Sequence, residues 1–413
     1  MRPTAANPLT PDLRAQLAAL APLHPQHGTS QNLPCKICGN PSAVFDVLDL
    51  HKHCAFENPY HFGLSGIAVP YHRCATCGFL FTGFFDDWAA DDWARYIYNA
   101  DYARVDPDYT GDRPRRLAQT LSTILRGCET ARILDYGSGS GIFADCLRAQ
   151  GFNHIETYDP FSHPAKPAPG FAIITCLEVL EHTVCPRAAL ADMQNLAAPG
   201  GAILFSQSVQ PADIHAVRGA WWYLAPRNGH ISTYTVATLC QLRPNPSDTL
   251  HGNGWLWAYV PHDAAPAIAQ SMARVGPAIS AITLAPPQMA NTAHTDDDWH
   301  DTETSAAGKF RWSKTTQLNW VLPALPHLPT QLHLRLPYSL EIHPGFAAAC
   351  TLAVNGCTAK TTVTPFDISA VVTITQRHEK LIVTLQTPPP CSPFAQRGAP
   401  DTRALGLAIA FGQ

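Results

Sequence analysis

The chain has 413 residues, of which 46% are hydrophobic, so it is long enough for two or three domains with buried cores. Its formal net charge of −4 gives no overall basic field that would attract nucleic acid or an anionic membrane surface. No apolar run reaches the length of a membrane span, and the N-terminal residues lack the apolar core of a signal peptide. We therefore expect a cytoplasmic protein with no membrane span and no nucleic-acid partner.

The first part of the chain, residues 1–30, is expected to form a short amphipathic helix and a linker. The module that follows, residues 31–111, contains two cysteine pairs and ends in a connector rich in aromatic residues (79–109). We expect this connector to form a lid or a wall of the acceptor site. The alternative is that its aromatic residues pack between two domains. The chain has 13 cysteines. We interpret most of them as buried apolar groups or metal ligands, because disulfides are rare inside the cell.

The two cysteine pairs each have the spacing C-x-x-C-G. They are Cys35 with Cys38, and Cys74 with Cys77. Each spacing places two thiolates on one side of a tight turn, and two such turns supply the four ligands of a tetrahedral Zn²⁺ site. Iron in the same cage, or a site that has lost its metal, is the alternative. A closed four-cysteine site has no open coordination position, so we expect this zinc to support folding and not catalysis.

Residues 133–141 have the pattern of a buried strand that runs into a glycine-rich turn, with a helix after it at residues 142–150. Glycine lets the backbone approach a ligand closely, and the start of a helix offers free N–H groups. A dinucleotide-binding turn is the competing interpretation. It is disfavoured because Gly137, Gly139 and Gly141 alternate instead of following G-x-G-x-x-G. Asp135, just before the turn, would also repel a pyrophosphate.

This D-x-G-x-G-x-G pattern resembles the first motif of class I S-adenosylmethionine-dependent methyltransferases. The resemblance continues in order along the chain, through Asp159, then the segment 176–182, and then the turn and strand at 199–205. It implies a Rossmann-like α/β core at residues 112–262 with the ligand at the carboxyl ends of the strands. One departure is the short proline-rich segment 160–170, which leaves no room for a helix and a strand. We therefore expect the third strand to be missing and the sheet to be trimmed at that edge.

The same resemblance implies a site for S-adenosylmethionine. The three glycines would lie against its methionine part, and Asp135 would accept hydrogen bonds from around its amino group. Asp159 would bind both ribose hydroxyls, because one carboxylate has two acceptor oxygens. The expected donor-binding residues are Asp135, Gly137, Ser138, Gly139, Gly141, Asp159, Pro160, Phe161, Cys176, Leu177 and Glu178.

Acceptor-binding residues are expected after the fifth strand. His230 is a candidate general base, and His182 occupies a position that often supports the acceptor pocket in the family. Structural roles for both histidines, in a helix cap and in a loop hydrogen bond, stay open. Three consecutive aromatic rings suit stacking on a sugar face or a lid that packs shut. The candidate acceptor-binding residues are Trp221, Trp222, Tyr223 and Arg227.

The C-terminal third changes character. Residues 263–308 are expected to hold one helix (263–275), a short strand that closes the core sheet (279–284) and a linker. From residue 309 the chain shows short alternating strands, with Asn355-Gly356 as a hairpin turn. This pattern indicates a β-sandwich of jelly-roll type. We interpret it as an accessory domain of a glycan-modifying enzyme, or as an oligomerisation module. The expected strands are 331–336, 351–354, 370–374 and 381–385.

A zinc module ahead of such a core resembles the sugar C-methyltransferases that act on nucleotide-linked deoxysugars, over roughly residues 30–260. Our first expectation is an O-methyltransferase that acts on a sugar hydroxyl of a nucleotide sugar or a bacterial surface glycan. C-methylation is the alternative, disfavoured because the chain lacks that family's second Rossmann-like domain. A non-catalytic glycan-binding scaffold is a further alternative. A nucleic-acid methyltransferase does not fit the acidic balance. Association into a homo-oligomer is left open.

Overall fold

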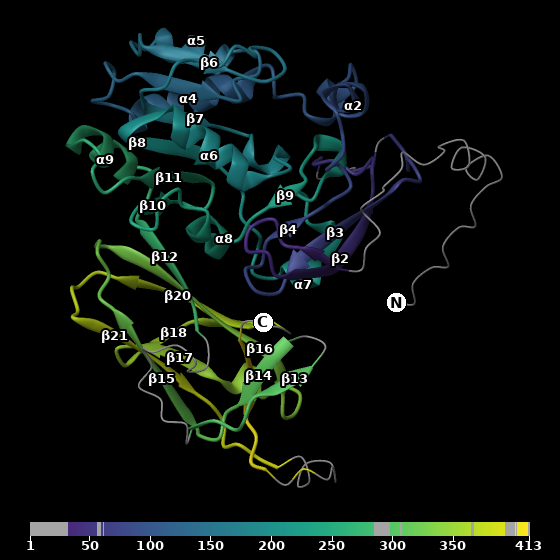
Figure 1. Ribbon diagram of the computed structural model, residues 1–413, viewed down its shortest axis with the longest axis vertical. Helices are drawn as coiled ribbons and strands as arrows, with labels where there is room; N and C mark the ends of the chain where they lie inside the picture. The colour runs from purple at the N-terminus through teal and green to yellow at the C-terminus, as the bar shows by residue number, and fades with distance from the viewer. Residues whose placement is uncertain are drawn as a thin grey trace, which may run out of the picture.

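The computed structural model describes residues 32–55, 59–60, 62–284, 298–305, 308–364, 367–392, 401 and 403–411. The helix and linker expected at residues 1–30 lie outside these ranges, as does most of the linker after residue 284. Figure 1 shows an α/β core, a smaller sheet beside it, and a group of C-terminal strands beyond β12. Within the described ranges, no helix has the length and apolar character needed to cross a membrane.

The core is a mixed sheet in the order β6-β5-β7-β8-β11-β10-β12. Its four parallel strands are β5 (Ile133–Tyr136), β6 (Ile155–Tyr158), β7 (Phe171–Cys176) and β8 (Ala197–Ser206). The remaining strands are β10 (Thr249–Gly252), β11 (Leu256–Val260), which is antiparallel to β8, and β12 (Ala278–Thr283). This is the Rossmann-like α/β core that the sequence predicts. Because β6 is the edge strand and residues 160–170 form no helix or strand, the missing third strand is confirmed.

Both faces of the core sheet are covered, because successive residues of a strand point to opposite sides. Ile133 and Ile173 face one layer, while their neighbours Leu134 and Ile174 face the other. The first layer consists of α4 (Asp112–Ile124), α5 (Ile142–Arg148) and α9 (Pro266–Ala273). The second consists of α6 (Pro186–Leu196), α8 (Val236–Gln241) and part of the cysteine-rich module.

The cysteine-rich module is an antiparallel sheet. Its order is β1 (Asn32–Pro34), β2 (Pro41–Asp49), β3 (Ala68–Cys74), β4 (Leu80–Phe81) and β9 (Ser232–Thr233). Its last strand, β9, comes from the core segment of the chain. β9 follows the loop that was expected to bind the acceptor, so pairing of β4 with β9 ties that loop to the module. The connector after β4 contains α2 (Ala90–Tyr96) and α3 (Tyr102–Val105), and the loop itself contains α7 (Ile214–Val217), η2 (Arg218–Ala220) and η3 (Pro226–Asn228).

The C-terminal strands form two antiparallel groups around one hydrophobic core. One group is β15 (Gln317–Pro323), β21 (Lys380–Gln386), β17 (Thr351–Val354) and β18 (Cys357–Ala359). The other is β13 (Glu303–Ser305), β14 (Gly308–Trp312), β22 (Leu407–Phe411), β16 (Thr330–Glu341), β20 (Asp367–Ile374) and β19 (Thr361–Val363). The predicted strands are present, and Asn355 and Gly356 make the β17–β18 turn with φ values of 49° and 80°.

The prediction that residues 279–284 close the core sheet is wrong. β12 pairs with β10 on one side and runs parallel to β16 on the other, so the core sheet continues into the C-terminal strands (Figure 1). At the end of this pairing, Arg335 donates hydrogen bonds of 2.9 and 2.6 Å to the carbonyls of Ala75 and Thr76, in the second cysteine turn. Three parts of the chain therefore meet at Arg335, and the boundaries at residues 262 and 308 stay predictions.

Candidate functional site

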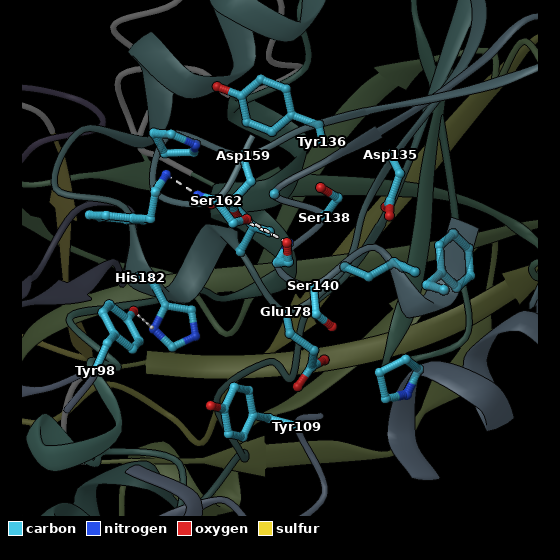
Figure 2. Close-up of a pocket in the computed structure, with 18 of the residues that line it drawn as sticks. Tyr98, Tyr109, Asp135, Tyr136, Ser138, Ser140, Asp159, Ser162, Glu178 and His182 are labelled. Carbon is cyan, nitrogen blue, oxygen red and sulfur yellow. Dashed lines mark hydrogen bonds between the residues drawn. The ribbon is translucent and has the colours of Figure 1, made fainter. Parts of the chain in front are cut away.

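A pocket of about 760 Å³ opens where β5, β6 and β7 end. Ligand pockets of roughly 300–1,000 Å³ are usual for small molecules, and open α/β sheets bind ligands at the carboxyl ends of their strands. One wall is the glycine-rich turn after β5, and the opposite wall comes from the aromatic connector. Figure 2 shows Asp135 and Ser138 on one side of this pocket and Tyr98 and His182 on the other.

The glycine-rich turn has the backbone conformation that requires glycine. Gly137, Gly139 and Gly141 have φ values of 75°, 52° and 79°, in the left-handed region that other residues rarely adopt. A Cβ atom on Gly137 would lie 2.3 Å from Cγ2 of Val179. At Gly139 and Gly141 a Cβ atom would meet nothing within 4 Å. The turn therefore packs tightly at its start and leaves open space at its tip.

Two polar atoms on this wall have no hydrogen-bond partner among the described residues. Asp135 is 3% exposed, its Oδ1 accepts a hydrogen bond of 3.1 Å from Thr175, and its Oδ2 is unpaired. Burial raises the pKa of Asp135 to about 7. The hydroxyl of Ser138 is also buried without a partner. Because buried polar groups are normally hydrogen-bonded, these two atoms mark where a ligand would supply partners.

Asp159 holds the tip of the turn. Its Oδ2 accepts a hydrogen bond of 3.1 Å from the N–H of Gly139, and its Oδ1 accepts bonds of 2.9 Å from the N–H groups of Phe161 and Ser162. A carboxylate has about four acceptor positions, so these three bonds leave about one position for a ligand, on Oδ2. Asp159 lines the pocket, as the sequence predicts.

Gly137, Ser138 and Gly139 line the pocket as predicted, whereas Gly141 does not. Pro160, Phe161, Leu177 and Glu178 line the pocket. The prediction for Cys176 is corrected: it is fully buried in the core and does not line the pocket. The reason is strand alternation, since the last residue of β7 points into the layer that contains α6. Glu178 has a φ of 56°, an uncommon value for a residue with a side chain, and accepts a hydrogen bond of 2.7 Å from Ser206.

The aromatic connector, which the sequence suggested as a lid or an acceptor wall, supplies several pocket residues. Tyr98, Tyr102 and Tyr109 all line the pocket, and the ring of Tyr98 lies 6.0 Å from that of Phe161. Arg113 also lines it and bonds both Asp106, at 3.0 Å, and Glu178, at 3.5 Å. The abundance of tyrosine in residues 96–109 was a usable signal, but the pairing of Arg113 with Glu178 depends on the fold alone.

The four expected acceptor-binding residues do not line the pocket, which corrects that prediction. Trp221 and Tyr223 are buried in the core of the cysteine-rich module, because their loop packs against β2, where Gly219 donates a hydrogen bond of 2.8 Å to Asp46. Trp222 is 44% exposed to solvent. Arg227 is buried and donates hydrogen bonds of 2.7 and 2.9 Å to Ile97 and Asn99. It therefore holds the aromatic connector in place from behind the pocket wall.

The two candidate catalytic histidines are adjacent. The rings of His182 and His230 are 5.0 Å apart, and His182 lines the pocket while His230 lies behind it, 7% exposed. Burial lowers the pKa of His182 to about 4 and the pKa of His230 well below its ordinary value. Both rings are therefore neutral at physiological pH. Glu181, beside them, belongs to the short 3₁₀ turn η1 (Leu180–His182) and was not predicted as a site residue.

The four predicted metal ligands Cys35, Cys38, Cys74 and Cys77 lie together. Their sulfur atoms are all within 4.8 Å of one another, with three pairs at 3.5–3.6 Å. Gly39 and Gly78 donate hydrogen bonds of 2.9 Å to the carbonyls of Cys35 and Cys74, which closes both turns. The sequence motif therefore yields a four-cysteine cluster, on the side of the core sheet opposite to α4 and α5.

Sequence comparisons find methyltransferases similar to the α/β core of this chain. Residues 109–243 match a family model described as a methyltransferase domain. The ubiquinone biosynthesis O-methyltransferase of Aromatoleum aromaticum is 29% identical over 135 residues. That match covers 25% of this chain and 57% of the relative, so the chain spans little more than half of the relative's length. Residues 109–243 are thus similar to a methyltransferase domain, and the family-model match extends neither to the cysteine cluster nor to the C-terminal strands.

Solved structures with a similar core are also methyltransferases by name. One is a putative O-methyltransferase from Nostoc punctiforme, with 12% identity, 39% of this chain and 59% of that chain covered, and a TM-score of 0.28. Another is magnesium protoporphyrin IX methyltransferase from Synechocystis with bound SAH, with 12% identity, 36% and 86% covered, and a TM-score of 0.25.

Proposed function

We propose that this protein transfers a methyl group from S-adenosylmethionine to a hydroxyl group of a sugar, either in a nucleotide sugar or in a bacterial surface glycan. The observation that carries the proposal is the pocket in the methyltransferase domain. Its glycine wall has unpaired buried atoms on Asp135 and Ser138, and its opposite wall presents aromatic rings and the neutral imidazole of His182. The pocket therefore has one side suited to the donor and one suited to the acceptor.

The residues of the glycine wall fit the donor. Asp135 Oδ2 and Ser138 Oγ supply the missing polar partners of an amino acid group, and the open tip at Gly139 and Gly141 admits it. Oδ2 of Asp159 has room for one ribose hydroxyl beside the N–H of Gly139. The donor supplies a methyl group that its sulfonium already activates, so the protein's task is to position the acceptor oxygen and remove its proton.

The acceptor side favours a sugar. Tyr98, Tyr102 and Tyr109 present ring faces with hydroxyl groups, a combination that suits the apolar face and polar edge of a sugar ring. Glu178 and His182 lie on the same side, and the carboxyl group of Glu178 can accept hydrogen bonds from hydroxyl groups. We assign the two C-terminal antiparallel sheets an accessory role in glycan binding, on the sequence pattern described above. His230 acts through His182, since it does not reach the pocket.

We further propose that the four-cysteine cluster binds a structural Zn²⁺ ion. A tetrahedron with Zn–S bonds of about 2.3 Å has sulfur–sulfur edges of about 3.8 Å, close to the separations in the cluster. Four thiolates complete the coordination, so such an ion holds β3 and the first cysteine turn together and takes no part in catalysis. Cys35, Cys74 and Cys77 pack in the same core cluster as the face of the core sheet.

Methyl transfer to a panel of acceptors tests the proposal. The protein is incubated with labelled S-adenosylmethionine and, separately, with nucleotide sugars and bacterial glycan extracts. We expect label in one class of sugar with the wild type and none with Asp159→Ala, which keeps the acceptor wall but loses the ribose partner. If the protein binds SAH in calorimetry but labels no sugar, the sugar assignment is contradicted. The assignment of the donor site would be unaffected by that result.

A further inference from the structure

We propose that Glu181, His182 and His230 form a second metal site, which binds a divalent first-row cation at the acceptor side of the pocket. One ligand atom from each of these three residues lies within 4.8 Å of the other two. Two imidazoles and one carboxylate are a donor set that holds divalent transition ions such as Mn²⁺ and leaves coordination positions open. This site is separate from the four cysteines, which belong to other elements.

Each of the three side chains has one polar atom fixed by the protein and one left over. Nδ1 of His182 lies 3.1 Å from the carbonyl of Gly229, and Nδ1 of His230 lies 3.0 Å from the carbonyl of Tyr223. A carbonyl accepts only, so a proton on Nδ1 of each ring satisfies these contacts and leaves a lone pair on Nε2. The hydroxyl of Tyr98, 3.2 Å from Nδ1 of His182, can accept from the same N–H. Histidines that bind metals are held in this way, with the second nitrogen donating to a carbonyl or a carboxylate.

The carboxyl group of Glu181 also has one oxygen with a hydrogen-bond partner and one without. Its Oε1 accepts a hydrogen bond of 2.7 Å from the hydroxyl of Tyr223, whereas its Oε2 is fully buried and has no partner in the described part of the chain. Glu181 is 0% exposed, and a carboxylate oxygen buried without a partner costs free energy. A cation bound by Oε2 and the two imidazoles would remove this cost.

The site also faces the pocket. His182 lines it, and Glu178, four positions earlier, projects into the same part of it (Figure 2). A cation held by Glu181 and the histidines would lie behind this part of the pocket wall and would reach the acceptor side beside His182. Two neighbouring hydroxyl oxygens of a sugar could occupy two of its open coordination positions, which would orient the acceptor and lower the pKa of the bound hydroxyl.

This role rests on the proposed function, while the cation site itself does not. In the transfer, the O–H bond of the bound hydroxyl breaks and its proton passes to solvent through the pocket opening. The oxygen forms a bond to the methyl carbon, and the S–CH₃ bond breaks with its electron pair remaining on sulfur. The cation stays bound and unchanged, and it stabilises the negative charge that develops on the oxygen.

Mn²⁺ binding measured by electron paramagnetic resonance tests the site without any sugar. Mn²⁺ is the probe because it prefers oxygen and imidazole ligands and has little affinity for the thiolates of the cysteine cluster. We expect the full-length wild type to bind one Mn²⁺ per chain, and Glu181→Gln and His230→Gln to bind it at least about tenfold more weakly. His262→Gln is the matched control, because His262 is an exposed histidine of the same domain. It should bind Mn²⁺ as the wild type does.

SAH affinity, measured by calorimetry on every variant, verifies folding, and His182→Gln provides a third variant at the pocket surface. Equal Mn²⁺ affinity in the wild type and in variants that still bind SAH would overturn the cation site. Because this experiment contains no acceptor, that result would not bear on the proposal of methyl transfer. With a sugar identified from the acceptor panel, turnover should rise in step with Mn²⁺ occupancy. Turnover that is independent of Mn²⁺ would overturn the activating role.

Discussion

The hydroxyl of Tyr223 donates a hydrogen bond of 2.7 Å to Oε1 of Glu181. Tyr223 comes from the loop after β8 and Glu181 from the turn after β7, so this bond connects the cysteine-rich side of the molecule to the pocket wall. Burial raises the pKa of Glu181 to about 7, and the bond from Tyr223 opposes that rise. Tyr223 therefore acts on the site from behind, although the sequence suggested that it contacts the acceptor.

The first prediction concerns this bond. Tyr223→Phe should lower the free energy of unfolding by about 1–3 kcal/mol, because it leaves Oε1 of a fully buried carboxyl group without its donor. Urea denaturation at pH 8, where more of Glu181 is ionised, is the measurement. Tyr136→Phe is the control, since the hydroxyl of Tyr136 bonds the partly exposed Asp192 over 3.0 Å and should matter less. A Tyr223 variant as stable as the wild type would show that the bond contributes nothing.

The second prediction concerns the donor. Asp159→Ala should weaken SAH binding by at least about tenfold, because it removes the ribose partner and the acceptor that holds the N–H of Gly139. Isothermal titration calorimetry measures it. Glu156→Gln is a matched control: Glu156 belongs to the same segment, is exposed, and pairs with Arg132 over 2.8 Å away from the pocket. Equal affinities for the wild type and the Asp159 variant would remove the ribose assignment.

The third prediction is a pH dependence of donor binding. The pKa of Asp135 is raised from 3.8 to about 7, chiefly by burial, so the folded protein retains a proton that the unfolded chain loses. The stability that this proton contributes is present below about pH 4 and is lost as the pH rises through about 7. A cationic amino group prefers the ionised carboxylate, so SAH affinity should increase over the same rise.

The pKa of Glu178 is also raised to about 7, so either carboxyl group could cause a pH dependence of SAH affinity. The variant Asp135→Asn distinguishes the two. We expect the increase of SAH affinity between pH 6 and pH 8 to disappear in Asp135→Asn and to persist in Glu178→Gln. The same increase in both variants would assign the titration to another group and leave Asp135 as a structural residue.

The fourth prediction concerns the cysteine cluster. Metal analysis should find about one zinc per chain, and Cys74→Ser should lose it and unfold at a lower temperature. The loss of stability follows from the position of the cluster, which packs against the core sheet together with Phe79 and Phe81. Cys357→Ser, which changes an exposed cysteine of the C-terminal strands, should keep its zinc. A well-folded wild type without zinc would contradict the assignment.

The fifth prediction concerns His230. His230→Ala should abolish methyl transfer and leave SAH binding unchanged, because His230 touches His182 and not the glycine wall. His215→Ala is a comparison at a partly buried histidine that does not line the pocket and whose ring packs against Phe45. Turnover that survives in the His230 variant would leave this residue with a purely structural role.

The sequence by itself determined the parts of the protein that depend on local spacing. The alternating glycines after Ile133–Asp135 predicted the turn and its position at the end of β5, because left-handed dihedral angles are a local requirement. The two C-x-x-C-G turns predicted the cysteine cluster in the same way. The proline-rich segment 160–170 predicted the missing strand, since chain length and proline exclude a helix there without reference to the rest of the molecule.

Only the tertiary structure decided which side chains face the pocket. Trp221 and Tyr223 looked like acceptor contacts but pack inward, because the pairing of β4 with β9 turns their loop toward the cysteine-rich sheet. Glu181 and His230 are far apart in sequence, and η1 and the loop after η3 bring them together. The parallel pairing of β12 with β16 joined what looked like two separate domains. Such contacts depend on long-range packing, which no local pattern encodes.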